Sequence, residues 1–515
     1  MIHVAGHVAL AAEEQVVKIK RWMILSLVLV IWLSACLPPQ HPAPGKSSVI
    51  TLLHTNDEHG WILPAEKNKT TLASGVAELM GVWQKNEGYP NASTIALSSG
   101  DMWTGPAIST WFKGESTAEV MNAMGYRATA VGNHDFDFGR DVLKQRRAAS
   151  KFPFLAANVT TKDGKPVDFA DPYTVVEVSG LKLGIVGLST RDTPNVTKVD
   201  NVSDLVFGNY QAALRKYVPE ARNKGASVVV VLAHVCLGNL STLARQVKDL
   251  EIPVMFGGHC HEADSRKVGE TWLVESGSFL RDYSRVDVSV DPVARRVTDV
   301  QVKLVKNEWG KSAGPIAPPD PAVKAIVDKW QVKAETELSK VIGYTQNGIT
   351  RPWPMYNLVT DAWLWAYPQA DIAISNVGGF RQDMNAGEIT LGEVVGVLPF
   401  DDTIYDVKLT GAQVLQDLTC CGGVAAAGVK MSLGKTILTK TGQPIDPNAT
   451  YRVLVNDFMY LGGDKFPLQK QDPNGYDTAI HWRQPVIDWL IAQNSSATSP
   501  IDNKIDTGSR GTSNR

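Results

Sequence analysis

Residues 131–139 read Val-Gly-Asn-His-Asp-Phe-Asp-Phe-Gly. They continue an apolar run, 128–131, that predicts a short buried strand, and Gly132 breaks that strand. Four of the five residues after the glycine carry polar side chains: Asn133, His134, Asp135 and Asp137. Strand ends followed by a glycine turn are where α/β folds place catalytic groups. The alternative is an Asn/Asp-rich turn whose side chains cap their own backbone.

The same arrangement recurs at four other places in the N-terminal half. Apolar runs at 49–53, 95–97, 228–232 and 253–256 each lead into polar residues. Those residues are Asp57 and His59, then Asp101, then His234, and finally His259 with His261. Near-continuous apolar strands separated by helical stretches predict sheets that are covered on both faces. We therefore expect residues 49–312 to form one layered α/β domain.

A second domain follows a proline-rich boundary. Residues 313–342 are expected to be a linker, with a helix at 322–341, and residues 343–493 a separate domain. That domain contains Asn-Val-Gly-Gly-Phe-Arg at 376–381, Leu-Pro-Phe at 398–400 and a Gly-Gly pair at 462–463. Beyond residue 493 the chain is rich in Ser, Thr, Asn and Gly, so residues 494–515 are predicted to be a disordered tail.

The N-terminus has the pattern of an export signal. Lys18, Lys20 and Arg21 precede an apolar core at 22–33 that is short for a membrane span, which favours a signal peptide. The core ends in Leu-Ser-Ala-Cys at 33–36, which resembles the lipobox of bacterial lipoproteins. We expect a signal peptide over 1–36, a lipid anchor on Cys36, a tether over 37–48 and a periplasmic or cell-surface location. The alternative is an ordinary secretory signal with an incidental cysteine.

Composition and cysteine usage set further limits. The 515 residues are 44% hydrophobic and 20% charged with a formal net charge of −2, so no basic field points to nucleic acid as a partner. No obligate protein partner is evident. The remaining cysteines are Cys236, Cys260, Cys420 and Cys421. Pairing is possible in an oxidising compartment, but adjacent cysteines rarely bond to each other without strain, and the pairing stays open.

The polar residues at the strand ends have the composition of a site for two divalent metal ions. They are Asp57, His59, Asp101, Asn133, His134, His234, His259 and His261. Two divalent cations about 3.5–4 Å apart need mixed nitrogen and oxygen ligands, and such a pair clamps both the attacking and the leaving oxygen of a phosphoryl transfer. Asp101 is the candidate bridging carboxylate. Each histidine alone would more often be a satisfied core or loop residue, but eight such residues at five strand ends favour the metal site.

These blocks also resemble a known family. Asp-Glu-His at 57–59, Gly-Asp at 100–101, Gly-Asn-His-Asp at 132–135, His234 and Gly-Gly-His-Cys-His at 257–261 match, in order, the calcineurin-like metallophosphoesterases. Segments 376–381, 399–400 and 458–464 resemble the C-terminal domain of the 5′-nucleotidase family, which includes bacterial UDP-sugar hydrolases and animal ecto-5′-nucleotidases. The resemblance covers about residues 49–490. It implies a layered α/β/β/α metallophosphoesterase domain joined by a linker helix to an α+β substrate-binding domain.

The resemblance also implies roles for single residues. Asp57, His59, Asp101 and His261 would hold one metal, and Asp101, Asn133, His234 and His259 the other, with zinc or manganese expected. In many nucleotidases the position of His261 is Gln or Asn. His134 matches the catalytic histidine and Asp137 its partner, which would hold the imidazolium oriented toward charge on the phosphoryl oxygens.

The second domain would bind the rest of the substrate. Phe400 and Phe458 match a pair that sandwiches the nucleobase, Asn376 a base-contacting asparagine, Asp464 a carboxylate on the ribose, and Arg381 an arginine on the phosphate. Core packing is the alternative for the two phenylalanines. The run that opens the domain, 351–358, departs from the family pattern in lacking its Glu and Gly. Arg351 is still expected to reach the phosphate, and the departure bears on substrate choice more than on chemistry.

The sequence thus predicts an exported, lipid-anchored phosphohydrolase. It would release phosphate from nucleoside 5′-monophosphates by in-line attack of a metal-bound hydroxide. The alternatives are a UDP-sugar or 2′,3′-cyclic nucleotide hydrolase, or a sulfur-compound hydrolase of the same architecture. A further alternative is a nucleotide-binding lipoprotein that has lost catalysis, which the complete set of candidate ligands argues against.

Overall fold

The structure is a computed structural model of the chain, and it describes residues 48–67, 70–306 and 317–510. The predicted signal peptide, its lipobox at Cys36 and nearly all of the tether lie outside these ranges. Within them, no helix combines the length and the apolar character that a membrane span requires.

The N-terminal domain contains two six-stranded sheets. The first has the order β16-β15-β1-β4-β5-β6, in which β1, β4, β5 and β6 run parallel. Its strands are β1 (Ser48–Thr55), β4 (Thr94–Ser98), β5 (Tyr126–Ala130), β6 (Phe154–Leu155), β15 (Asp282–Asp291) and β16 (Arg296–Lys306). The second has the order β13-β14-β12-β11-β9-β8, with β9, β11, β12 and β14 parallel. Its strands are β8 (Tyr173–Val178), β9 (Leu181–Leu188), β11 (Val228–Ala233), β12 (Val254–Phe256), β13 (Ala263–Val268) and β14 (Thr271–Ser276).

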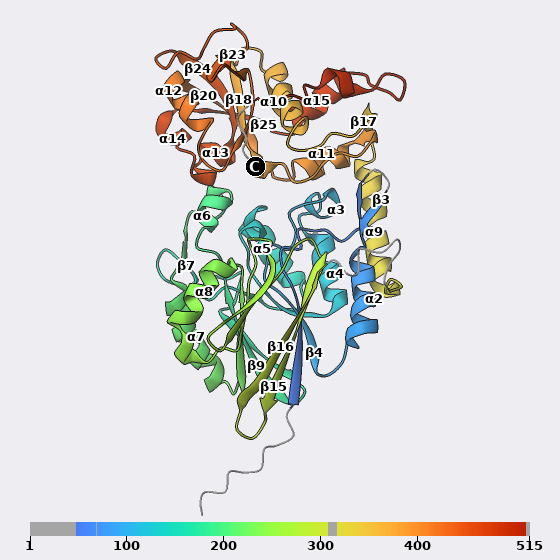
Figure 1. Cartoon of the computed structure of the whole chain (residues 1–515), viewed down its shortest axis with the longest axis vertical. Coiled ribbons are helices and arrows are strands. Elements are labelled where there is room, and N and C mark those ends of the chain that lie inside the picture. Colours follow the sequence, from blue (N-terminus) through green and yellow to red (C-terminus); the bar gives the residue numbers. More distant parts are fainter. Residues whose placement is uncertain (1–47, 68–69, 307–316, 511–515) are drawn as a thin grey trace, which may run out of the picture.

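Helices cover the outer face of each sheet, while the two inner faces pack on each other. Leu52, Leu97, Val230 and Phe256 are fully buried between the sheets. On the side of the first sheet lie α2 (Val76–Glu87), α3 (Ala107–Thr110), α4 (Glu115–Met124) and α5 (Arg140–Ala149); α7 (Tyr210–Asn223) and α8 (Leu237–Gln246) cover the second. The predicted α/β/β/α architecture is confirmed (Figure 1).

Short elements complete this domain. They are β2 (Ala65–Lys67), β3 (Thr70–Ala73), β7 (Val159–Thr161), β10 (Leu205–Phe207), α6 (Thr193–Val196), and the 3₁₀ turns η1 (His134–Phe136), η2 (Val199–Asn201) and η3 (Lys248–Leu250). Of these, η1 and α6 carry residues of the site described below.

The linker helix α9 (Pro321–Leu338) packs on the N-terminal domain (yellow in Figure 1). The Asp320 side chain caps its first turn by accepting a hydrogen bond from the Val323 N–H. Val327 and Trp330 are buried against the helices of the first sheet, and the Trp330 indole donates to Glu119 at 2.8 Å. The helix therefore holds the start of the second domain at a fixed place on the first.

The second domain is built on a five-stranded sheet of order β21-β18-β24-β20-β25. Its strands are β18 (Ile372–Asn376), β20 (Thr403–Thr410), β21 (Val424–Ala427), β24 (Thr450–Asn456) and β25 (Tyr476–His481). One face packs on α10 (Met355–Ala366), α11 (Leu391–Val397) and α15 (Gln484–Ala492), and the other on α12 (Gly411–Asp417), α13 (Asp457–Tyr460) and α14 (Leu468–Gln471). Smaller elements are β17 (Val341–Thr345), β19 (Gly387–Thr390), β22 (Val429–Ser432), β23 (Lys435–Leu438), η4 (Val377–Gly379), η5 (Gly463–Lys465) and η6 (Ile501–Lys504).

The prediction of a disordered tail is wrong for residues 494–510. Ile501 is fully buried, and the Asp502 carboxylate accepts hydrogen bonds from the N–H groups of Gln346 and Asn347 just after β17. Arg510 forms an ion pair with Asp361 on α10. The prediction rested on the polar composition of the segment, which gives no sign of these few specific contacts. Residues 511–515 lie outside the described ranges.

Two disulfides are present in the part of the chain that the structure describes. Cys236 is bonded to Cys260, and Cys420 to its neighbour Cys421. The pairing that the sequence left open thus includes a bond between adjacent cysteines. Glycines at 422 and 423, both with φ near +100°, follow the pair and provide a backbone that few other residues could adopt.

Candidate metal centre and substrate cavity

The predicted metal ligands converge at the carboxyl ends of the parallel strands. Their ligand atoms form two groups, each within 4.8 Å: Asp57, His59 and His261 in one, and Asp101, His234 and His259 in the other. The Asn133 side-chain oxygen lies 3.1 Å from His234 Nε2 and so adjoins the second group. Asp101 Oδ2 lies 3.0 Å from His234 Nε2 and 3.8 Å from His59 Nε2, so its carboxylate stands between the groups, as a bridging ligand must.

The backbone at these residues is unusual. Five of the seven predicted ligands have a positive φ: Asp57, His59, Asp101, His259 and His261. Non-glycine residues in this region cost free energy, and such strain gathers at functional sites. Neighbouring glycines make room for the ligands, since a Cβ at Gly132 would lie 2.1 Å from Asp101 Oδ1. These strained backbone conformations direct the side chains toward a common point, and the surrounding structure must offset their cost in free energy.

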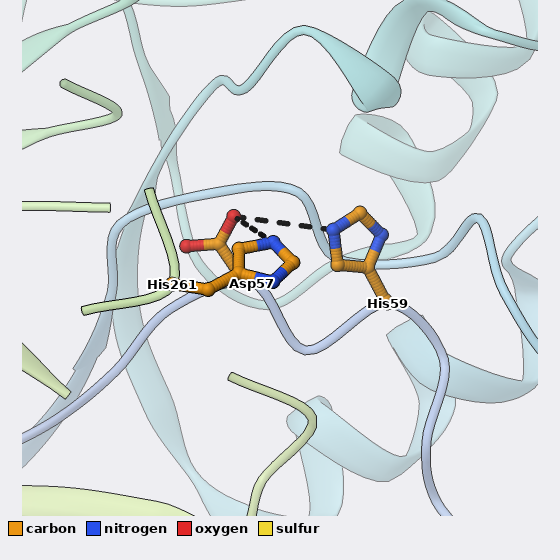
Figure 2. Close-up of side chains that lie close together, drawn as sticks. All are labelled: Asp57, His59 and His261. Carbon is orange, nitrogen blue, oxygen red and sulfur yellow. Dashed lines mark ion pairs between the residues drawn. The ribbon is translucent and has the colours of Figure 1, made fainter. Parts of the chain in front are cut away.

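Figure 2 shows how Asp57 faces its two partners in the first group. Its Oδ1 atom lies 3.2 Å from His261 Nε2 and 3.9 Å from His59 Nε2. That oxygen is buried and lacks a well-aligned hydrogen-bond donor among the described residues. A buried, unpaired carboxylate oxygen surrounded by imidazole nitrogens is the arrangement expected of a cation site.

The charge balance of the second group fits a divalent cation as well. Burial alone would raise the pKa of Asp101 and lower that of His234, but it is outweighed by their mutual attraction together with that of neighbouring histidines and carboxylates. The pKa of Asp101 falls well below its ordinary value, and that of His234 rises to about 10. The buried carboxylates Asp57 and Asp101 thus demand positive charge. Mixed imidazole and carboxylate donors suit zinc and manganese.

His134 and Asp137 form the predicted dyad beside the metal ligands. His134 Nδ1 lies 2.8 Å from Asp137 Oδ2, and Asp137 Oδ1 accepts a hydrogen bond from the Thr197 hydroxyl. Burial would lower the pKa of His134, but the carboxylates of Asp137 and Asp101 raise it above its usual value. The dyad can therefore present a cationic imidazolium next to the metal groups.

A cavity of about 390 Å³ connects the two domains at this point. From the N-terminal domain it is lined by Asp101, Asn133, His134, Asp137, His259 and His261, and from the second domain by Asn376, Arg381, Phe400, Phe458 and Asp464. Asp57, His59 and His234 lie beneath these lining residues and are fully buried. The structure thus brings all the predicted site residues but one to a single place.

Residues of the second domain reach directly to the metal groups. Arg381 Nη2 lies 3.5 Å from His59 Nε2, and its guanidinium lies 5.8 Å from the centre of the Phe400 ring. Phe400 stacks on His134 with ring centroids 5.6 Å apart. Asn376 donates a hydrogen bond to Asp464 at 2.9 Å, which fixes both side chains on the cavity wall. The two domains are therefore in contact at the reacting end of the cavity.

The structure does not bring Arg351, predicted to reach the phosphate, to the cavity. Arg351 is absent from the residues that line the cavity. Its guanidinium forms an ion pair with Asp383 at 2.8 Å and donates to the Phe380 carbonyl at 3.0 Å. These two partners lie on either side of Arg381 in the sequence, so Arg351 supports the segment that carries Arg381.

Sequence reasoning missed a cluster of three charged residues at the cavity, of which Lys198 and Asp402 line its wall. Lys198, from the segment after α6, reaches across the domain boundary to Asp457 at 2.7 Å, and Asp402 lies beside them. Burial and the neighbouring Asp457 carboxylate raise the pKa of Asp402 well above its ordinary value. None of the three follows an apolar strand within the N-terminal domain, so the pattern that pointed to the candidate metal ligands gave no signal for them.

Comparisons with known proteins agree with this geometry. Residues 336–471 match the family model of the 5′-nucleotidase C-terminal domain. A 5′-nucleotidase of Vibrio cholerae is 25% identical over 93% of this chain and 96% of its own. Other relatives are longer: the chain spans 38% of the endonuclease YhcR of Bacillus subtilis and 64% of the cell wall protein Lmo0130 of Listeria monocytogenes.

Solved structures of related proteins share the two-domain fold of this chain. A 5′-nucleotidase precursor from Thermus thermophilus matches with a TM-score of 0.75 and 25% identity over 90% of this chain and 99% of that one. A sulfate thiohydrolase from Thermus thermophilus, SoxB, matches with a TM-score of 0.69 at 17% identity over 89% and 95% of the two chains, which concerns the fold alone. The resemblance to the 5′-nucleotidase family is confirmed: the family model matches part of the second domain, and the relatives and solved structures extend the similarity over both domains.

Proposed function

Since this chain is related over most of its length to the 5′-nucleotidase family, we propose that it releases phosphate from nucleoside 5′-monophosphates with two divalent metal ions. The observation that carries the proposal is the single cavity between the domains. It joins two groups of metal-ligating side chains around Asp101 to the His134–Asp137 dyad and to a pair of phenylalanines.

The first domain would hold the reacting phosphate. Asp57, His59, Asp101 and His261 would ligate one ion, and Asp101, Asn133, His234 and His259 the other. When bound, the two ions supply positive charge to the phosphate oxygens and activate the attacking water. The water oxygen would form a bond to phosphorus as the bond to the nucleoside oxygen breaks, and the nucleoside would leave as its 5′-hydroxyl with a proton that the attacking water gives up.

The residues around the phosphate have separate tasks. The His134 imidazolium, held by Asp137, would stabilise negative charge that develops on the phosphoryl oxygens. Arg381 would donate two hydrogen bonds to the phosphate, which its planar guanidinium is shaped to do. Arg381 is half-buried beside His59, and the carboxylates of Asp101 and Asp137 balance its charge, which supports this role.

The second domain would select the nucleoside. Phe400 and Phe458 both line the cavity and would stack on the base, while Asp464 and Asn376 would bind the ribose and the base edge. The adjoining cluster of Lys198, Asp402 and Asp457 adds hydrogen-bonding groups to this end of the cavity. Such groups favour a substrate with polar edges over a small inorganic ester.

Truncating Phe458 tests the base clamp. In Phe458→Ala we expect KM for AMP to rise about 10-fold to 100-fold, because stacking contributes roughly 1–3 kcal/mol per base. KM for ribose 5-phosphate, which lacks a base, should stay within a factor of two or so on the same reasoning. Initial rates of phosphate release for both substrates check this. An equal effect on both would mean that Phe458 only supports the fold of the cavity wall.

The alternatives keep the metal site and change the substrate. A UDP-sugar, a 2′,3′-cyclic nucleotide or a sulfur ester would use the same ligands. A panel of AMP, UDP-glucose, 2′,3′-cyclic AMP and a thiosulfate conjugate separates them by the product released. Phosphate from AMP supports the proposal, whereas activity confined to another member of the panel refutes the nucleotidase assignment and retains the metal centre.

We also propose that the protein is exported and anchored by lipid on Cys36. The basic and apolar segments that precede the Leu-Ser-Ala-Cys run support this, as does the relative described as a cell wall protein. The catalytic domain would then begin about a dozen residues from the membrane surface. Metabolic labelling of the full chain with a palmitate analogue, with Cys36→Ser as the control, tests the anchor: label that persists in the variant refutes it.

A further inference from the structure

The Cys236–Cys260 disulfide lies among the metal ligands. Cys236 is two residues beyond His234, and Cys260 stands between His259 and His261. The bond therefore links the turn that follows β11 to the turn that follows β12. Through these two turns it ties together three of the four histidines among the metal-ligating groups.

The turn at residues 257–261 has little else to fix its tip. His259 and His261 both have a positive φ, which side chains with a Cβ adopt only when the surroundings hold them there. The His259 N–H donates to Asp57 Oδ2, while among the described residues the N–H groups of Cys260 and His261 have no acceptor. The Cys260 residue is exposed and lines the substrate cavity.

The other end of the disulfide is firmly anchored. Cys236 precedes the first residue of α8, and Leu237 and Leu240 on that helix are fully buried in the core behind the second sheet. Val235 accepts a hydrogen bond from the Gly258 N–H, so the two turns already run side by side. The disulfide thus joins a strained, exposed turn to a rigid one.

We infer that the Cys236–Cys260 disulfide is a positioning element of the metal centre, which holds His259 and His261 in the geometry that binds the ions. The inference rests on the metal site of the proposed function. Reduction adds two electrons and two protons to the disulfide and yields two thiols. It frees the turn to relax from its positive φ values, so the ions leave faster, while the base clamp in the other domain is untouched.

The rate of zinc loss from the zinc-loaded full chain measures this effect. The variants are Cys236→Ser/Cys260→Ser and, as the matched control, Cys420→Ser/Cys421→Ser, which removes the disulfide of the other domain. Transfer of Zn²⁺ to a chromophoric chelator should be at least about 10-fold faster in the first variant, the lower bound for loss of groups that orient metal ligands. The control should match the parent chain. Equal rates in both variants would overturn the inference.

Two further outcomes are distinguishable. If Cys236→Ser/Cys260→Ser does not fold, the parent chain is reduced with a phosphine, which becomes the phosphine oxide, and then reoxidised. Zinc loss must accelerate on reduction and slow again on reoxidation, and a rate that ignores the cycle overturns the inference. If the parent chain itself retains no zinc, the proposed metal function fails, whereas a parent that holds two ions and releases them at the same rate with and without the disulfide refutes only the inference about the cysteines.

Discussion

Replacing Asp101 with asparagine is expected to remove both metal ions and to lower kcat/KM for AMP by roughly 10³-fold or more. Asp101 stands between the two groups of ligands, so the substitution takes a negative charge from both sites at once. The ions contribute several kcal/mol of charge stabilisation, and each 1.4 kcal/mol is a factor of ten in rate. Metal content by mass spectrometry and phosphate release from AMP measure the two effects.

The size and shape of the side chain barely change in Asp101→Asn, so the fold should survive. A matched control is Asp299→Asn, the same substitution at an exposed position on β16 of the same domain. The control should keep its metal and its activity. If Asp101→Asn retained two ions and the rate of the parent chain, Asp101 would not bridge the site, and the assignment of both ligand groups would fail.

Replacing His134 with alanine is expected to lower kcat by about 10² to 10⁴-fold while both metal ions are retained. His134 belongs to neither ligand group, and its contact with Asp101 is made by its backbone N–H, which alanine preserves. Retained metal with lost turnover therefore separates the dyad from the metal site. Loss of metal together with activity would show that His134 supports a ligand and would refute its separate catalytic role.

The same variant distinguishes two tasks for His134. If the imidazolium stabilises charge on the phosphoryl oxygens, the loss of kcat should be similar for AMP and for p-nitrophenyl phosphate. If it instead protonates the leaving oxygen, the loss of kcat should be much smaller for p-nitrophenyl phosphate, because its leaving group, p-nitrophenolate, departs without a proton. Asp137→Asn should show the same pattern with a smaller loss, because the imidazole remains but its orienting carboxylate is gone.

The sequence could predict which residues gather at the candidate metal site because the signal is local. Each of Asp57, Asp101, Asn133, His234 and His259 comes a few residues after an apolar strand, and parallel strands end at one edge of a sheet. Folding brings these ends together whatever the details of the helices. The two-sheet architecture follows from the same strands. They are apolar on both faces because each sheet packs on the other sheet with one face and on helices with the other.

Features that depend on contacts between distant segments could not be predicted from the sequence. Lys198 meets Asp457 only because the domains dock, and Arg351 turns to Asp383, which no spacing rule foretells. Residues 494–510 are ordered through a few specific contacts, such as the burial of Ile501, whereas their polar composition predicted a disordered tail. The pairing of the four cysteines also depends on how the chain folds, and the sequence alone left it open.

The most direct test of the central claim is phosphate release from AMP as metal is returned to the stripped chain. The account predicts no release after complete removal of metal and a rise with added Mn²⁺ or Zn²⁺ that saturates near two equivalents per chain, because two groups of ligands share Asp101. Undiminished hydrolysis in the stripped chain, or release that saturates at one equivalent, would contradict the two-metal mechanism.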